Sequence, residues 1–188
     1  WHRERCGQIA IPVGRQHGSG AMDASRMNID GRPWRTIGLE PNGRSVWVID
    51  QTALPYSFGT KTLSSCQQAA EAISTMVVRG APLIGVTGAY GLMLALQADP
   101  SDSALATAHA LLLSTRPTAV NLQWALDRVR DLVMALPPEQ RAEAARQEAA
   151  RIADEDVAMC EAIGEHGLKL FQQLAAARPA ERQSEPFQ

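Results

Sequence analysis

The stretch from Met76 to Leu96, MVVRGAPLIGVTGAYGLMLAL, constrains the fold more than any other part of the chain. An apolar stub leads through Arg-Gly-Ala-Pro into a second apolar run, which contains Gly85, Gly88 and Gly91. Pro82 suits the start of a helix, because its fixed φ is helical and its missing N–H would have no partner there. The stretch therefore predicts a tight turn followed by a helix that reaches about residue 97.

Arg79, Gly80 and Ala81, directly before this helix, form a candidate anion-binding turn. The start of a helix carries unpaired backbone N–H groups and the positive end of the helix dipole, so it attracts anions. Gly80 and Ala81 leave the backbone accessible, and the planar guanidinium of Arg79 suits a phosphate group. The same residues also suit a simple turn into a buried helix, because such turns occur in proteins of every function. The pattern leaves both interpretations open.

Familiar phosphate-binding motifs do not fit this turn. Residues 80–87 read GAPLIGVT, which has the glycine spacing and the threonine of a P-loop, but Val86 occupies the position of the phosphate-binding lysine. The dinucleotide fingerprint GxGxxG is absent, since the three helical glycines have a different spacing and no clear strand precedes them. Nucleophile motifs such as GxSxG and SxxK are also absent. The sequence thus argues against a nucleotide site.

Composition excludes several other classes of function. The chain has 188 residues, 45% of them hydrophobic and 20% charged, which is ordinary for one globular domain or slightly more. Its formal net charge of −2 and pI near 6.1 give no reason to expect a nucleic acid or a membrane as a partner. The longest apolar run, residues 81–96, is short for a bilayer and interrupted by glycines.

The three cysteines, Cys6, Cys66 and Cys160, lie far apart and have no zinc-ligand spacing. We therefore expect no metal and a reducing, cytoplasmic compartment with free thiols. Residues 1–26 have no sustained periodicity and no apolar segment of a secretory signal. They are expected to form a flexible leader, with Met27 as the natural start.

The segment 27–62 is predicted to form a small antiparallel sheet. Two β-rich runs, one containing Trp34, Ile37 and Leu39 and the other spanning residues 45–50, flank a Pro-Asn-Gly turn at residues 41–43. Such a turn between two β-rich runs predicts a hairpin. Residues 56–62 are expected to add a further short strand.

The segment 63–178 is predicted to form a helical bundle, and residues 179–188 a disordered tail. Ser64 or Ser65 can cap the first helix. Trp124 is expected in the core or at an interface, and Ile152, Met159 and Ile163 are expected to mark a buried seam on the last helix. The expected fold class is α+β, mainly α, with a small antiparallel β-sheet followed by the bundle. Helices are expected at residues 66–78, 82–97, 104–114, 121–136 and 139–174.

A second arginine turn, Arg116-Pro117-Thr118, precedes the fourth expected helix. Pro117 restricts Arg116 to an extended conformation. If this turn converged with the turn at Arg79, the two would form a pocket for a phosphorylated small molecule. Asn121 could cap the helix or bind a ligand. The sequence leaves the convergence open.

Several motifs together resemble the amino-terminal part of the methylthioribose-1-phosphate isomerase family of methionine salvage. The same superfamily includes ribose-1,5-bisphosphate isomerase and the regulatory subunits of the translation-initiation guanine nucleotide exchange factor. The resemblance covers roughly residues 32–174. It rests on MVVRGAPLIGVTGAYGLMLA (76–95), RPTAVNLQWALDR (116–128), AIGEHGLKL (162–170) and WVIDQTALP (47–55).

The resemblance implies a function and a site. Family members convert 5-methylthioribose 1-phosphate, an aldose phosphate, to 5-methylthioribulose 1-phosphate without a cofactor, and the full-length enzyme is expected to be a homodimer. In that family, residues at the positions of Arg79, Gly80, Ala81 and Arg116 contact the phosphorylated sugar substrate. The resemblance therefore favours the phosphate-site interpretation of both arginine turns.

The sequence departs from this family after Arg182. There the family continues into a His-Cys-Asn segment with the catalytic cysteine and into a Rossmann-like domain with the catalytic aspartate, whereas this sequence reads QSEPFQ. None of Cys6, Cys66 and Cys160 stands in such a segment. We expect a chain without catalytic residues that binds substrate weakly at most. The alternatives are a non-catalytic interaction module, like the exchange-factor subunits, and a ribose-1,5-bisphosphate isomerase-like protein.

Overall fold

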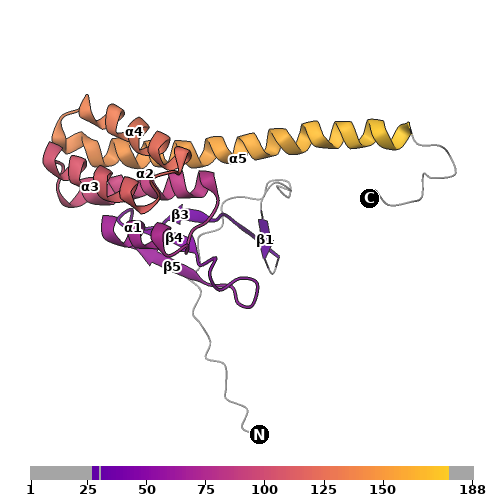
Figure 1. The fold of residues 1–188 in the computed structure, drawn as a ribbon, viewed down its shortest axis with the longest axis horizontal. Coiled ribbons are helices and arrows are strands. Elements are labelled where there is room, and N and C mark those ends of the chain that lie inside the picture. Colours follow the sequence, from indigo (N-terminus) through magenta and orange to yellow (C-terminus); the bar gives the residue numbers. More distant parts are fainter. Residues whose placement is uncertain (1–26, 30, 178–188) are drawn as a thin grey trace, which may run out of the picture.

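A computed structural model of the protein describes residues 27–29 and 31–177. A layer of short strands lies below a bundle of helices, and the last helix continues well beyond the bundle (Figure 1). The predictions for residues 1–26 and 179–188 lie outside the described residues. The strands are β1 (Met27–Ile29), β2 (Arg32–Trp34), β3 (Ile37–Leu39), β4 (Val46–Ile49) and β5 (Thr60–Leu63), and the helices are α1 (Cys66–Ser74), α2 (Ala81–Ala98), α3 (Asp102–Thr115), α4 (Val120–Met134) and α5 (Pro138–Ala176).

The strands form two antiparallel sheets. Strands β1 and β2 make a hairpin, and β3, β4 and β5 make a three-stranded sheet in that order. Between β3 and β4, the Asn42 side-chain oxygen accepts hydrogen bonds from the N–H groups of Arg44 (2.8 Å) and Ser45 (3.2 Å), while Gly43 adopts a φ of 66°. This turn chemistry confirms the predicted hairpin. The expected third strand is also present, as β5.

Helix α1 begins where its cap was predicted and ends earlier than expected. The Ser65 hydroxyl accepts a hydrogen bond from Gln68 N at 3.2 Å. The helix was expected to reach Val78, but it ends at Ser74, because Met76 takes a left-handed φ of 62° and the Val78 N–H bonds back to Ala72 O at 3.2 Å. The reversal buries Val78 and brings the chain to the start of α2.

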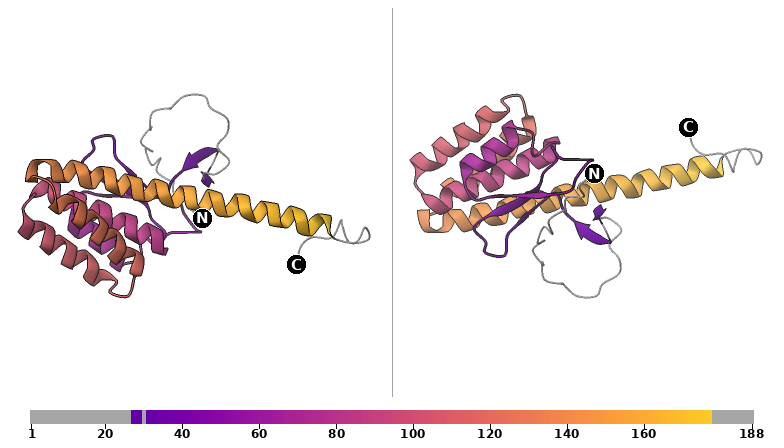
Figure 2. Two further views of the ribbon diagram at one scale, coloured as in Figure 1. Left: turned by 90° about the horizontal axis from the view of Figure 1, so that it is seen from above. Right: turned by 90° about the horizontal axis from the view of Figure 1, so that it is seen from below.

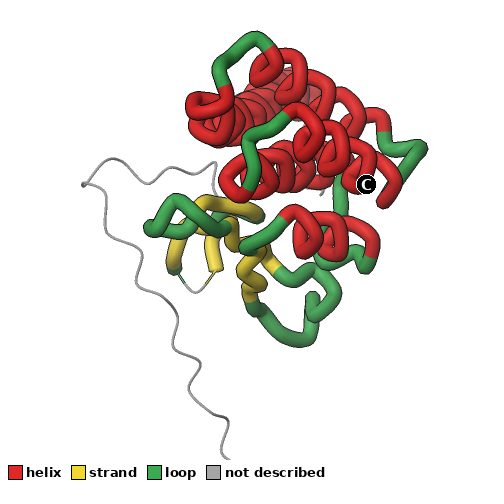
Figure 3. Tube along the Cα trace, turned by 90° about the vertical axis from the view of Figure 1, so that its left-hand side faces the viewer, coloured by secondary structure: helices red, strands yellow, loops and turns green. Residues whose placement is uncertain are grey.

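Helix α2 is the centre of the bundle and packs against α1, α3, α4 and α5. Figure 3 shows the helices packed beside one another, next to the short strands. Helix α2 carries no charged residue, and 13 of its 18 residues are buried. Among the described residues it is the one helix long and apolar enough to cross a membrane by length and composition, with 67% of that stretch buried in the fold. A helix that is apolar on every side also suits a position at the centre of a protein core.

The three glycines of α2 permit close helix contact, as expected, but they do not line one side. A Cβ at Gly85 would lie 2.8 Å from Asn121 O, and one at Gly88 would lie 2.5 Å from Leu122 Cδ1, so both face α4. A Cβ at Gly91 would instead meet Leu112 on α3 and Ala69 on α1. A three-residue spacing drifts around a helix of 3.6 residues per turn, so the glycines serve different neighbours.

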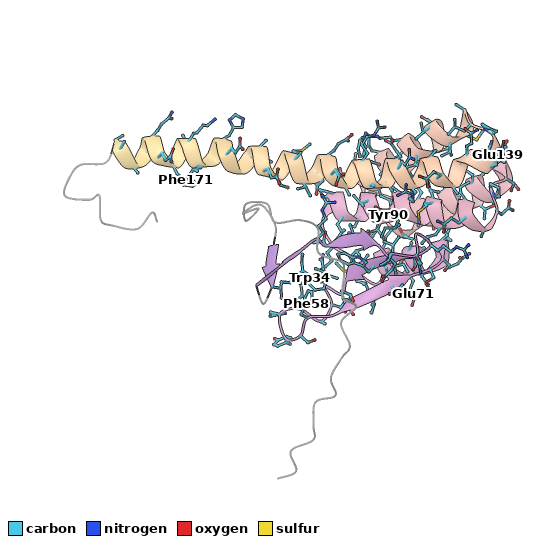
Figure 4. All side chains as sticks on the ribbon, turned by 180° about the vertical axis from the view of Figure 1, so that it is seen from behind. Trp34, Phe58, Glu71, Tyr90, Glu139 and Phe171 are labelled. Carbon is cyan, nitrogen blue, oxygen red and sulfur yellow. The ribbon has the colours of Figure 1, made fainter. Side chains whose placement is uncertain are left out.

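Helix α5 packs on α2 and α4 through its first half only. Arg141, Ala145, Glu148, Ala149 and Ile152 are buried there. Beyond residue 157 every residue of the helix except Gly167 is exposed, and the helix projects away from the bundle in each view (Figures 1 and 2). In Figure 4, the labelled Phe171 lies far from Tyr90 and Glu139 in the bundle.

The buried-seam prediction is therefore correct for Ile152 and wrong for two residues. Met159 is 64% and Ile163 65% exposed. Trp124 is 49% exposed, so it is not a core residue, and the Arg128 guanidinium lies 5.1 Å from the centre of its ring. The fold class is confirmed: the protein is α+β and mainly α, with a small antiparallel sheet followed by a helical bundle.

Candidate functional site

The start of α2 is an open, uncapped helix terminus. Gly80 is its N-cap, with a φ of 95° and no side-chain hydrogen bond to the first turn. Nothing lies within 4 Å of where a Gly80 Cβ would stand. Arg79, Gly80, Ala81 and Pro82 are all exposed. Since Ala81 is the first helical residue, Pro82 occupies the second position and leaves the remaining N–H groups of the first turn available to an anion.

Arg79 is anchored by the loop that follows β4. Its Nη2 donates to Gln51 O at 3.3 Å, and the Gln51 N–H donates to Val77 O at 3.0 Å. These contacts join residues far apart in the sequence and place loop 50–59 beside the arginine turn. Gln51 carries no sequence motif that predicts a place in the site. Its backbone makes both contacts, so the residue type gave no signal.

Asp50 holds the beginning of this loop in place. Its Oδ1 accepts hydrogen bonds from Thr52 N (3.0 Å) and Thr52 Oγ1 (2.5 Å), and its Oδ2 lies 3.0 Å from Lys61 Nζ. The Thr52 hydroxyl, and after it Lys61, lowers the pKa of the Asp50 carboxyl from its usual value. A carboxylate is thus maintained at the base of the loop at neutral pH. An Asp-x-Thr sequence is a signal for such a turn.

The second arginine turn leads into α4. Arg116 ends α3 with φ −146° and ψ 76°, the extended backbone that Pro117 requires. Its carbonyl accepts a hydrogen bond from Ala119 N at 2.9 Å. Ala119 is the N-cap of α4 and supplies no side-chain cap, so of the two roles considered for Asn121, cap or ligand donor, the structure excludes the cap. Asn121 is instead an exposed residue of the first turn.

The two arginine turns lie at the same end of the bundle. Gly85 faces Asn121, and Gly88 faces Leu122 and Leu126, so α2 and α4 run in the same direction with their N-termini side by side. Each start carries a partial positive charge and an arginine, and neither has a side-chain cap. Uncapped helix starts and guanidinium groups are the features that favour an anion such as a phosphate ester.

The P-loop pattern does not correspond to a phosphate loop. Residues 81–87 are helical, and the Thr87 hydroxyl is buried and donates to Leu83 O at 2.7 Å. Thr87 therefore cannot hold a metal–nucleotide complex. This agrees with the sequence, in which Val86 occupies the position of the phosphate-binding lysine of a P-loop.

Neither described cysteine has the environment of a nucleophile beside this site. Cys66 is buried, and burial raises the pKa of its thiol to about 11. Cys160 is exposed on the projecting half of α5, contrary to the packing role that a helical context suggests. Within the described residues, no three His, Cys, Asp or Glu side chains gather closely enough to hold a metal ion.

A hollow of about 360 Å³ lies away from the arginine turns. Asp102, at the start of α3, and Met134, at the end of α4, both line it, together with Leu105, Ala106 and Arg130. Because Met134 marks the C-terminal end of α4, this hollow is at the opposite end of the bundle. Its lining is mainly apolar and offers no cluster of groups for phosphate.

Comparison with known proteins gives consistent matches. Residues 77–176 match the model of the initiation factor 2 subunit family. The chain is 61% identical over 150 residues to a methylthioribose-1-phosphate isomerase of Methylobacterium nodulans, an alignment that covers 80% of this chain and 41% of the relative. The chain thus spans about two fifths of the length of this curated relative.

Two solved structures resemble the fold. One is 5-methylthioribose 1-phosphate isomerase from Pyrococcus horikoshii, with a TM-score of 0.59 and 38% identity over 64% of this chain and 36% of that one. The other is translation initiation factor eIF-2B, subunit delta, from A. fulgidus, with a TM-score of 0.60 and 34% identity over 65% of this chain and 37% of that one. These similarities confirm the resemblance inferred from the motifs.

Proposed function

The chain belongs to the initiation factor 2 subunit family, and from this premise we propose that it forms the phosphate and sugar grip of an aldose–ketose isomerase. The proposed substrate is 5-methylthioribose 1-phosphate and the product 5-methylthioribulose 1-phosphate. The observation that carries the proposal is the pair of arginine turns, Arg79-Gly80-Ala81 and Arg116, at adjacent helix starts. The high identity to a relative named methylthioribose-1-phosphate isomerase supports the choice of substrate.

The proposed grip has the chemistry that a sugar phosphate needs. A phosphate monoester is a dianion near neutral pH, and guanidinium groups and helix N-termini both favour that charge. Gly80 leaves open space at its Cβ position, so a ligand oxygen can approach the backbone of α2 directly. Arg79 is held through Gln51 O, which fixes the position of its guanidinium before a ligand arrives.

The reaction itself needs groups beyond this grip. The sugar ring must open, and a hydrogen must then move from C2 to C1, so that C2 becomes the carbonyl carbon. No oxidant is consumed, since one carbon is oxidised and its neighbour reduced. The sequence has no His-Cys-Asn segment, and Cys66 is buried and protonated at neutral pH. We therefore propose that this chain holds the substrate weakly, as part of a cytoplasmic pathway, and does not turn it over by itself.

Calorimetric titration of the purified chain with 5-methylthioribose 1-phosphate tests the grip. Arg79→Ala and Arg116→Ala are each expected to weaken binding by about 10- to 100-fold, as for the loss of a charge-assisted hydrogen bond. Arg44→Ala is the matched control, because Gln97 Nε2 contacts Gly43 O and places Arg44 near the far end of α2. Equal binding by all three variants contradicts the grip, and turnover by the unmodified chain in a coupled assay contradicts the proposed inactivity.

A second candidate function is a non-catalytic interaction module. The likeness to the eIF-2B delta subunit is as strong as the likeness to the isomerase structure, with TM-scores of 0.60 and 0.59. In a module of this kind, Arg79 and Arg116 would stabilise the fold and would not bind a sugar phosphate. Their replacement would then lower the melting temperature and leave sugar-phosphate affinity unchanged, which is the opposite of the result expected for the grip.

A further inference from the structure

One peptide group joins Asp50 to Arg79. It lies between Gln51 and Thr52, and its N–H donates a hydrogen bond to Asp50 Oδ1 at 3.0 Å. Its C=O accepts a hydrogen bond from Arg79 Nη2 at 3.3 Å. The peptide bond is planar and trans, so its N–H and C=O point in opposite directions. A carboxylate and a guanidinium are therefore bonded to the two sides of one rigid unit.

The charges on both sides strengthen these hydrogen bonds. The Thr52 hydroxyl, and after it Lys61, lowers the pKa of the Asp50 carboxyl, so this group is ionised at neutral pH. A peptide group whose N–H donates to a carboxylate is polarised, and its oxygen becomes a better acceptor. The guanidinium on the other side is always protonated. Asp50 thus acts on the hydrogen bond of Arg79 through the peptide group.

Further contacts fix the base of the loop that contains this peptide group. The Asp50 N–H donates to Gly59 O at 2.9 Å, which closes the loop. Phe58, next to Gly59, packs edge-on against Trp34 with the ring centres 4.8 Å apart (Figure 4). The loop is therefore held against the strands on one side, while its peptide group meets the arginine turn on the other.

Lys61 offsets the negative charge of Asp50. Its Nζ lies 3.0 Å from Asp50 Oδ2, which is not the oxygen that accepts from Thr52. A carboxylate near an anion site repels a phosphate group, unless a neighbouring cation balances its charge. Because Lys61 provides that balance, the main effect of Asp50 on the arginine turn is one of orientation.

Arg79 keeps most of its donors for a ligand. A guanidinium has five N–H groups in one plane, and the bond to Gln51 O is the one side-chain hydrogen bond of Arg79 within the described residues. The residue is exposed. A guanidinium whose plane is fixed in advance loses less conformational freedom when it binds an anion. We propose that Asp50 is a positioning residue for Arg79 in the phosphate grip, acting through the peptide group that joins them. This inference rests on the proposed function.

Nuclear magnetic resonance of the isotope-labelled, ligand-free chain tests the positioning by itself. The side-chain N–H signals of Arg79 are identified by their loss in Arg79→Lys. Asp50→Ala is expected to shift these signals, because it releases the guanidinium, and Asp50→Asn is expected to shift them less, because it keeps an oxygen acceptor. Asp99→Ala is the matched control, since Asp99 Oδ1 accepts from Ser101 N at 2.9 Å at the C-terminal end of α2. Unchanged Arg79 signals in both Asp50 variants overturn the proposal.

Calorimetric titration with 5-methylthioribose 1-phosphate tests the consequence for binding. Asp50→Ala is expected to weaken binding by about 3- to 10-fold, the cost of ordering one long side chain, and Asp99→Ala is expected to have no effect. The loss of a negative charge alone would strengthen anion binding, so stronger or unchanged binding by Asp50→Ala overturns the proposal. With Arg79→Ala already present, Asp50→Ala should cause no further loss.

The two arginine and aspartate variants separate this inference from the grip itself. If Arg79→Ala weakens binding and Asp50→Ala does not, the grip stands and the positioning role is wrong. If the two losses multiply in the double variant, Asp50 acts independently of Arg79, and the positioning role is again wrong. If Arg79→Ala binds as tightly as the unmodified chain, the grip is wrong and the inference falls with it.

Discussion

The two halves of α5 have the same apolar face in opposite surroundings. In the first half Ala145 and Ala149 are fully buried and Ile152 is 5% exposed, whereas in the second half Met159 and Ile163 are 64% and 65% exposed. The helical spacing continues from one half to the other without interruption. The comparison shows that periodicity identifies the apolar face of a helix, while the rest of the fold determines whether anything covers it.

The buried charged residues of α5, Arg141 and Glu148, both lie in its first half. In the first half, buried Arg141 donates to Leu136 O (3.0 Å) and Pro100 O (2.8 Å) and pairs with Asp102 (2.5 Å). Buried Glu148 binds both Arg128 and Arg151. Buried charges need such partners, because an unpaired charge in the interior is costly. The first half therefore depends on specific neighbours for its two buried charges.

Hydrogen exchange should show the largest difference between the halves. Amides of residues 142–152 are expected to exchange only through global unfolding, and amides of residues 160–174 through local fraying, a difference of about a thousandfold or more in protection. The measurement is mass spectrometry at a concentration at which the chain is monomeric. Equal protection in both halves would mean that the projecting helix is covered within a single copy.

Truncating Ile152 and Ile163, one in each half of α5, should give the next largest difference, which is in the free energy of unfolding. Ile152→Ala is expected to lower the free energy of unfolding by about 2–4 kcal/mol, through lost burial and the cavity left behind. Ile163→Ala is expected to change it by less than about 0.5 kcal/mol in the monomer, since its side chain is already in solvent. Urea unfolding of both variants measures the two values. Similar losses would contradict the difference in burial.

Replacing glycine by alanine should change stability in opposite directions in the packed helix α2 and in the projecting half of α5. Gly85→Ala is expected to destabilise the fold by about 1–2 kcal/mol, because its Cβ would meet the backbone of Asn121 at 2.8 Å. Gly164→Ala is expected to stabilise the projecting helix by about 0.5–1 kcal/mol, because the site is open and alanine favours helix. Thermal unfolding tests the first and helical circular dichroism the second. A stabilising Gly85→Ala would mean that α2 and α4 are not tightly packed there.

The smallest effect should appear at the boundary between the halves, where Glu155 meets Arg128. Hydrogen bonds from Arg128 lower the pKa of the Glu155 carboxyl below its usual value of 4.5. A lowered folded-state pKa adds stability above about pH 4.5, and this stability disappears as the pH falls through the folded-state pKa. Glu155→Gln should therefore be slightly less stable than the unmodified chain at pH 7 and equal to it in acid. With Arg128→Ala already present, Glu155→Gln should show no such pH dependence.

Local signals explain why much of the fold could be predicted. The Asn42 turn, the Ser65 cap and the restriction that Pro117 places on Arg116 each act within a few residues. At each of these three places the local structure is the one that the sequence predicts. The early end of α1 was missed because it depends on Met76 adopting a left-handed backbone, which its side chain does not favour.

The candidate site was predictable in part. Both arginine turns were identified from local patterns, and the glycines of α2 indicated a close neighbour. The sequence did not reveal that Gly85 and Gly88 face α4, which sets the two helix starts side by side. It also did not reveal that the backbone of Gln51 holds Arg79, since backbone contacts between distant segments leave no trace in residue type. Whether the arginines bind a sugar phosphate stays a prediction.

The central position of α2 has a consequence for synthesis on the ribosome. Its 18 residues are complete at Ala98, but three of its neighbours, α3, α4 and the first half of α5, follow later, up to Ile152. At about 5–20 residues per second, this interval lasts on the order of several seconds. During that time the most apolar helix of the described fold lacks part of its cover. The nascent chain is therefore a natural client for a chaperone that binds apolar segments near the tunnel exit.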